Sequence, residues 1–306
     1  MTELQVQQHS RCATWAREVG LSAAGTAPPT DVFVLVEHPL PWQGDLGSDP
    51  TLKELERIAK ENAGPGRSVR LQAVAVDADH PLRQVVVFQA AVSPFTGYGR
   101  VDGLGAVDDL PGLVAQLVAL EPRPPTSRDV TDLLVCTHGS RDTCCGSMGT
   151  RLWKELEETL PNVQIWRTSH TGGHRFAPTA ITFPDGNYWA HLDGAIVRGL
   201  VRRTLDPVEA AGHLRGCAAF SSAVQVADGA VLATRGWEWL DCARFGDERG
   251  PRRVEICFES PDGERGGYDV LLEEGRTMPV PDCGADPSDA KKWQAELKVS
   301  RVRAWS

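Results

Sequence analysis

The sequence has no long hydrophobic run, few basic clusters and too few cysteines for a disulfide scaffold. No stretch approaches the roughly 18 consecutive apolar residues of a membrane-spanning helix. The N-terminal MTELQVQQHSR also lacks the charged and apolar segments of a secretory signal. The net charge of −9 disfavours nucleic acid as the main partner, because phosphate binding needs clustered lysine and arginine. We therefore expect a cytoplasmic protein that binds neither membranes nor nucleic acid.

Familiar catalytic motifs are missing as well. The sequence contains no P-loop, no GxGxxG fingerprint and no pattern typical of a Ser/His/Asp triad. No pair of carboxylates stands out as the pair of a glycosidase would. These absences point away from an enzyme with its own substrate, and we name no catalytic residue.

Eight cysteines in 306 residues are too sparse to staple a fold. Cytosolic thiols are normally reduced, so cysteines that cluster indicate metal binding or redox chemistry. Cys12 is interpreted as a small apolar packing residue, and Cys217, Cys242 and Cys257 as core residues. Cys283, within PVPDCG, is expected to be an exposed free thiol, and no histidine or cysteine lies near it in sequence.

Candidate metal ligands gather in residues 136–174. They are Cys136, then Cys145 or its neighbour Cys144, then His170 and His174. Residues 131–135 (TDLLV) predict a buried strand that ends at the first cysteine, and residues 163–167 predict a second strand before the histidines. Both ligand pairs are therefore expected on loops at strand ends, joined by a helix over 147–160.

The fold class expected is α/β (α+β), with two tandem units and a smaller C-terminal unit. Strands and helices follow the same order in residues 31–120 and after residue 131, and EPRPPT (121–126) predicts a linker. Only the second copy has candidate ligands. The predicted domains are 1–124, an N-terminal unit without ligands; 125–205, the unit with the metal site; and 206–306, an α+β unit of unknown role.

Ligand spacing favours iron over zinc. A zinc finger usually has a tight C-x2-4-C knuckle and a helical histidine pair, whereas here the first pair is C-x8-C or C-x7-C. Gly172 and Gly173 weaken a helix between the histidines. A wide loop with two thiolates and a short loop with two imidazoles fit a two-iron cluster. Two alternatives remain: a zinc-stabilised interaction domain, and a thiol oxidoreductase using Cys144 or Cys145, although no C-x-x-C motif is present.

Two motifs resemble the sucrase/ferredoxin-like family. They are C-x-H-G-x-x-D-x-C-C-G over 136–146 and W-R-x-S-H-x-G-G-H-R-F-A-P-T over 166–179. The resemblance is strong over about 131–205, weak over 31–120 and slight beyond. It implies thioredoxin-like units and a bis-histidinyl [2Fe-2S] cluster bound by Cys136, Cys145, His170 and His174. Cys145 is preferred because the second ligand of the family stands nine residues after the first.

Such a cluster makes the protein an electron carrier with a redox partner protein. Replacing two thiolates by neutral imidazoles lowers the negative charge, so the potential should exceed the all-cysteine range. Proton uptake at His170 or His174 is expected to accompany electron uptake. His138 is interpreted as a positioning residue, Asp142 as an acceptor for a histidine N–H, and His191 as a cross-strand packing residue.

Overall fold

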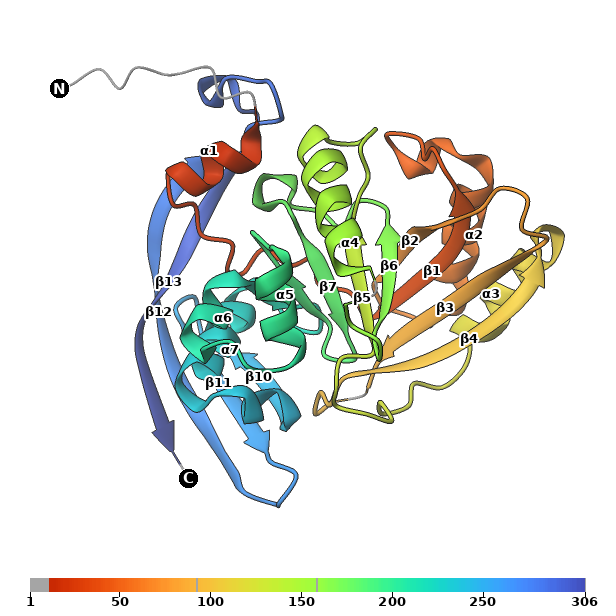
Figure 1. The fold of residues 1–306 in the computed structure, drawn as a ribbon. Coiled ribbons are helices and arrows are strands. Elements are labelled where there is room, and N and C mark those ends of the chain that lie inside the picture. Colours follow the sequence, from red (N-terminus) through yellow and green to blue (C-terminus); the bar gives the residue numbers. More distant parts are fainter. Residues whose placement is uncertain (1–10, 92, 158, 306) are drawn as a thin grey trace.

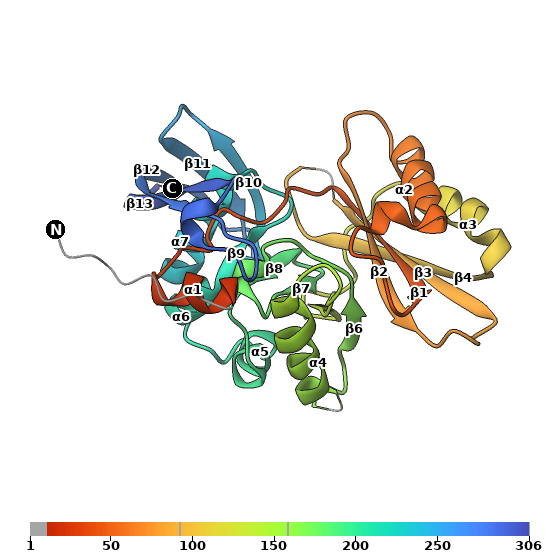
Figure 2. The same ribbon diagram turned by 90° about the horizontal axis from the view of Figure 1, so that it is seen from above.

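Two β-sheets organise the chain in this computed structural model, which describes residues 11–91, 93–157 and 159–305. The first ten residues of the expected polar lead-in lie outside the described residues. Helices cover the faces of the larger sheet. The smaller sheet lies at the opposite side of the molecule from β4 (Figures 1 and 2). The mixed α/β class predicted from the sequence is confirmed.

The larger sheet has the strand order β4-β3-β1-β2-β6-β5-β7-β8-β9. Its first half comprises β1 (Val32–Pro39), β2 (Val69–Val76), β3 (Leu82–Ala90) and β4 (Tyr98–Ala106), with helices α2 (Pro50–Asn62) and α3 (Leu110–Val118). The second half comprises β5 (Asp132–Cys136), β6 (Gln164–Thr168), β7 (Ala180–Phe183) and β8 (Asn187–Trp189), with helices α4 (Thr150–Leu156) and α5 (Gly194–Val201).

The two halves have the same strand pairing. β1 pairs parallel with β2 and antiparallel with β3, which pairs antiparallel with β4. β5 likewise pairs parallel with β6 and antiparallel with β7, which pairs antiparallel with β8. The halves meet where Val74 of β2 pairs with Thr168 of β6. This is the order that a tandem arrangement predicts, while the likeness to thioredoxin stays an expectation from the family resemblance.

Local sequence explains the central strands and the first long helix. All five residues of β5 are buried, as are the first five of β1, because helices or loops cover both faces of these apolar runs. Helix α2 begins at Pro50, and the carboxylate of Asp49 accepts a hydrogen bond from the Leu52 N–H. Residues 98–106 form β4 although sequence analysis did not place a strand there, since three glycines weaken its strand pattern.

The C-terminal part of the chain packs against the rest of the protein and adds a strand to the larger sheet. Its elements are α6 (Pro207–His213), β9 (Leu214–Cys217), α7 (Ser222–Arg235), β10 (Ala243–Glu248), β11 (Arg253–Glu259), β12 (Arg265–Pro279) and β13 (Trp293–Trp305). β9 lies between two helices in sequence and joins the larger sheet beside β8. A single cluster of buried apolar residues runs from Ala27 to Leu272, so the three predicted units share a core.

Helix α1 (Cys12–Glu18) packs against the C-terminal hairpin, far away in sequence (Figure 1). The Arg276 guanidinium donates to the carbonyls of Val19 and Gly20, at 2.9 and 2.6 Å. The Ser22 N–H donates to the buried carboxylate of Glu296 at 2.9 Å. These contacts hold residues 19–22, which follow α1, on β12 and β13.

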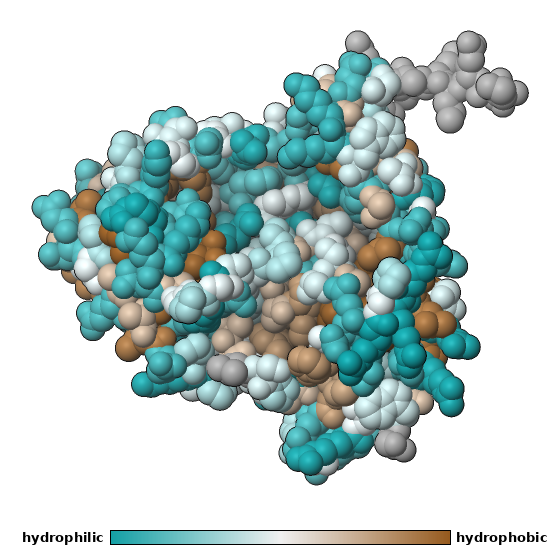
Figure 3. Space-filling view, turned by 180° about the vertical axis from the view of Figure 1, so that it is seen from behind, coloured by the Kyte–Doolittle hydropathy of each residue, from teal (hydrophilic) through white to brown (hydrophobic). Residues whose placement is uncertain are grey.

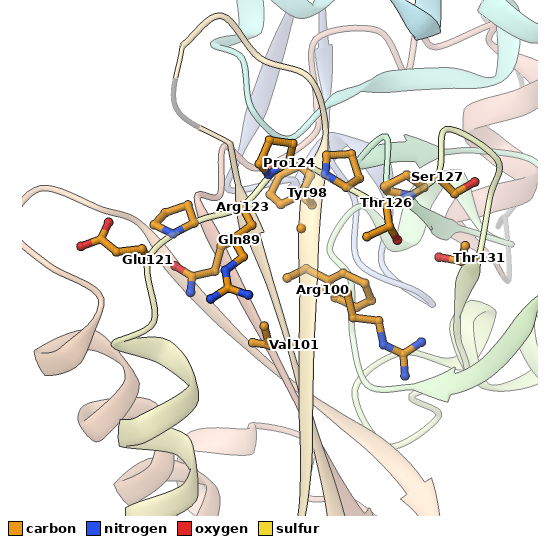
Figure 4. Close-up of a pocket in the computed structure, with 15 residues that line it drawn as sticks. Gln89, Tyr98, Arg100, Val101, Glu121, Arg123, Pro124, Thr126, Ser127 and Thr131 are labelled. Carbon is orange, nitrogen blue, oxygen red and sulfur yellow. The ribbon is translucent and has the colours of Figure 1, made fainter.

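The proline-rich linker follows the edge of the sheet. Residues 121–126 contain no helix or strand and close a pocket of about 380 Å³ against β3 and β4 (Figure 4). The face shown in Figure 3 is mainly hydrophilic, with hydrophobic residues in scattered groups around a central hollow. No helix among the described residues is long and apolar enough to cross a membrane.

Candidate metal centre

The cysteine loop starts where β5 ends at Cys136. The carboxylate of Asp142 accepts hydrogen bonds from the N–H groups of Cys144 and Cys145, at 2.8 and 3.3 Å. A π-helical turn over Cys145–Gly149 follows, and it buries both neighbouring thiols. π-turns are often found at functional sites.

A close backbone contact explains two glycines of the cysteine motif. A Cβ atom on Gly146 would lie 2.5 Å from the Cα of Gly139. Real Cβ atoms do not approach another carbon so closely, so this loop requires glycine at position 146. A Cβ atom on Gly139 would lie 3.3 Å from the Gly146 Cα, which is a tight contact.

The histidine loop follows β6 and turns on two glycines. Gly172 and Gly173 have φ values of +86° and +70°, in the left-handed region that favours glycine. A short helical turn, His174–Phe176, begins directly after them. Two arginines hold the loop from neighbouring strands: Arg70 donates to the His170 carbonyl at 2.9 Å, and the buried Arg215 donates to the Gly172 carbonyl at 2.9 Å.

Three of the predicted ligands converge between these loops. The His170 Nδ1 lies 3.9 Å from the Cys136 Sγ and 3.7 Å from the Cys145 Sγ. The donor atoms of these three residues lie within 4.8 Å of one another, as a metal centre requires. Both cysteines are buried and the histidine is half-buried, so the sulfurs are shielded from water while the imidazole has access to solvent.

The two cysteine sulfurs influence each other's pKa. The Cys145 thiol donates a hydrogen bond to the Cys136 sulfur, which holds the pKa of Cys136 well below its ordinary value. The same contact raises the pKa of Cys145, and burial raises it further. The two pKa values are therefore pushed in opposite directions, which favours ionisation of Cys136 over Cys145.

His174 lies beside this group and contacts other residues. Its ring centroid is 6.1 Å from that of His170. Its Nδ1 is 3.0 Å from the Cys12 Sγ and 3.2 Å from an Asp142 carboxylate oxygen. Asp142 thus has the histidine contact expected from the sequence, whereas His174 can complete the first group only if its ring turns from Cys12 and Asp142.

A second group of thiols surrounds the neighbouring Cys144. Its Sγ lies 3.8 Å from that of Cys12 and 3.1 Å from that of Cys283, and Cys12 and Cys283 are 3.2 Å apart. The Cys12 thiol donates to Cys144, which lowers the pKa of Cys144 and raises that of Cys12. Cys12 is buried in a small apolar cluster, which agrees with its interpretation as a packing residue, although its thiol also contacts two other cysteines. Cys283 is half-buried rather than exposed, and its sulfur contacts those of Cys12 and Cys144.

No spacing rule could have found these two cysteines. Cys12 and Cys283 are separated by 271 positions and meet Cys144 only because α1 and the β12–β13 loop fold over the ligand loops. The one signal in the sequence is the position of Cys283 between an aspartate and a glycine in a proline-rich turn.

His138 positions the histidine loop and belongs to neither group. Its Nδ1 accepts a hydrogen bond from the His170 N–H at 3.1 Å, and its Nε2 contacts the Gln43 carbonyl at 2.8 Å. Because a carbonyl only accepts, the proton is on Nε2 and the ring is neutral. Burial lowers the pKa of His138 in the same sense. This fits the positioning role that the sequence indicated.

His191 differs from its predicted role in a strand. β8 ends at Trp189, and His191 follows with a φ of +55°. Its Nδ1 accepts a hydrogen bond from the Arg17 Nε at 3.0 Å, so it links α1 to the body of the protein. It therefore acts on the helix that carries Cys12 rather than as a cross-strand neighbour.

Each histidine of the loop lines a surface cavity. His170 lies with His138 and Arg141 on a cavity of about 410 Å³. His174 lies with Asp142, Asp282 and Cys283 on another of about 390 Å³. A buried pair of sulfurs with imidazoles toward solvent suits a redox centre that exchanges electrons, and protons, at the surface.

The structure is that of a mixed α/β protein in which two strand-end loops bring together cysteine and histidine side chains that could hold a metal ion. A sequence model described as sucrase/ferredoxin-like matches residues 23–216, more than half of the chain. The protein therefore belongs to the sucrase/ferredoxin-like family.

Similarity to characterised proteins is limited to one part of the chain. It is 33% identical over 89 residues to "Altered inheritance of mitochondria protein 32" of the yeast Meyerozyma guilliermondii. The match covers 26% of this chain and 32% of that protein, so only about a third of the relative is represented. No solved structure matches the chain significantly.

Proposed function

We propose that the protein is an electron carrier with one [2Fe-2S] cluster, bound by Cys136, Cys145, His170 and His174. The observation that carries this proposal is the convergence of two buried sulfurs and the His170 Nδ1 within 4.8 Å of one another. Membership of the sucrase/ferredoxin-like family supports it. When bound, such a cluster accepts and releases one electron.

Residues around the site support a higher potential than that of an all-cysteine cluster. Two neutral imidazoles replace two thiolates, and the guanidinium groups of Arg70 and Arg215 bind the same loop. Both the neutral imidazoles and the positively charged guanidinium groups make the surroundings of the irons less negative, which favours the reduced state of the cluster. We expect a midpoint potential in the Rieske range, roughly −150 to +300 mV, rather than near −400 mV.

The redox partner and the place of action are part of the same proposal. We propose a partner protein that docks over the half-buried histidines, since electrons must leave where the shielding is thinnest. We propose a cytoplasmic location from the sequence. Because the name of the yeast relative mentions mitochondria, a mitochondrial location is the alternative to compare with it. Proton coupling at the histidines stays a prediction, which a flat midpoint potential between about pH 6 and pH 10 would contradict.

Visible absorption with iron and sulfide analysis tests the cluster. The anaerobically purified protein should be brown-red, and His170→Ala should lose colour and iron. His80→Ala is the matched control, because His80 is exposed and lies in the turn between β2 and β3. A colourless protein that contains zinc in the Cys136 group would instead favour the zinc-stabilised interaction domain.

A further inference from the structure

The second group of thiols has no role in the proposed cluster. It contains Cys12 of α1, Cys144 of the cysteine loop and Cys283 of the β12–β13 loop, with an oxygen of Asp142. These four donor atoms lie within 4.8 Å of one another. Cys12 and Cys283 also lie outside residues 23–216, which match the family.

We propose that Cys12, Cys144, Cys283 and Asp142 bind a structural zinc ion. Three soft thiolates and one carboxylate are a donor set that zinc accepts in a closed tetrahedral site. Tetrahedral zinc with bonds of about 2.3 Å to sulfur places the sulfurs about 3.8 Å apart. The Cys12–Cys144 distance is 3.8 Å, and the other two, 3.1 and 3.2 Å, need to open by only about 0.6–0.7 Å.

The structure favours Asp142 over His174 as the fourth donor. An Asp142 oxygen lies 3.5 Å from the Cys283 Sγ, close to the separation expected of two donors on one zinc ion. The other carboxylate oxygen contacts the His174 Nδ1 at 3.2 Å. Asp142 would therefore lie between the two sites, with one oxygen toward zinc and the other released when the His174 ring turns to join the proposed cluster.

The site would join three segments that are far apart in sequence. α1 and the β12–β13 loop reach the cysteine loop there, with Ala13, Ala177 and Met148 packed around the sulfurs. A zinc ion would hold these two covering segments over the ligand loops. This gives the C-terminal unit a function, because its Cys283 loop covers the centre of the second unit.

Zinc-edge X-ray absorption of the unsubstituted, anaerobically purified protein tests the proposal without interference from iron. We expect about one zinc ion per chain, with three sulfur neighbours near 2.3 Å and one oxygen near 2.1 Å. Absence of zinc, or a first shell without sulfur, would overturn the proposal. So would a mass loss of two hydrogens showing a disulfide within the group, or iron in place of zinc.

Substitutions separate this site from the proposed cluster. Cys12→Ser and Cys283→Ser should each lose zinc and keep iron, whereas His170→Ala should lose iron and keep zinc. Cys283→His should retain zinc with two sulfur neighbours instead of three, which a purely structural role of Cys283 does not predict. Cys257→Ser is the matched control, since Cys257 is a half-buried cysteine of β11 outside both groups. Zinc that persists in both serine variants would refute the assignment.

Discussion

Protonation of His191 should loosen the helix that carries Cys12. The neutral ring accepts a hydrogen bond from the Arg17 Nε, and Arg17 also donates to the Ala177 carbonyl at 3.4 Å. Burial lowers the pKa of His191 to about 4, and the positive charges of Arg17, His213 and Arg215 lower it in the same direction. A protonated ring could no longer accept from Arg17, so one of the contacts that hold α1 would be lost.

The sign and size of the effect follow from linkage. Near pH 5 an unfolded histidine binds a proton and folded His191 does not, so acid favours the unfolded state. This stability is complete above the unfolded pKa near 6.5 and is lost as the pH falls toward 4. Moving from about pH 8 to pH 5 should therefore cost about 2 kcal/mol through this one residue.

The His191→Asn variant isolates the contribution of His191 to the pH dependence of stability. The amide oxygen of asparagine can replace Nδ1 as the acceptor, asparagine tolerates the positive φ, and it does not titrate. In urea unfolding followed by tryptophan fluorescence, the advantage of the wild type over this variant should shrink by about 2 kcal/mol between about pH 8 and pH 5. His80→Asn, at an exposed histidine, is the control. Equal pH dependence of the wild type and His191→Asn would refute the reasoning.

Two further predictions concern the ligand loops. His138→Ala removes the acceptor of the His170 N–H and should weaken iron retention about 10- to 100-fold in a chelator competition; unchanged retention would exclude its positioning role. Gly146→Ala should destabilise the protein by about 1–3 kcal/mol in urea unfolding, because its Cβ would meet Gly139. Gly112 lies in helix α3 with free space around it, so Gly112→Ala should instead stabilise the protein by about 0.5–1 kcal/mol. Equal effects of Gly146→Ala and Gly112→Ala would count against the close contact between Gly146 and Gly139.

Most of the frame around the site could be predicted because its signals are local. The apolar runs of β1 and β5, the turn residues around the histidines and the period of α2 are each readable within a few residues. β4 and β9 escaped prediction because tertiary pairing, rather than local pattern, makes them strands. β4 is rich in glycine, and β9 lies between two helices.

The site was predictable only as far as its motif extends. Cys136, Cys145 and His170 meet because each stands at the end of one of two adjacent parallel strands or in the turn that follows. The contact of His174 with Cys12 depends on α1, which packs through the C-terminal hairpin, and no pattern within the motif encodes that packing. Arg215, which holds the histidine loop, likewise comes from a strand in the C-terminal part.

The most direct test of the central claim is an EPR spectrum of the dithionite-reduced protein, recorded beside its His170→Cys and His174→Cys variants. Bis-histidinyl ligation predicts Rieske-like g-values in the wild type and a shift toward ferredoxin-like values in each variant. A spectrum that neither substitution changes would contradict the ligand assignment. Absence of any signal, from a protein free of iron and sulfide, would contradict the cluster itself.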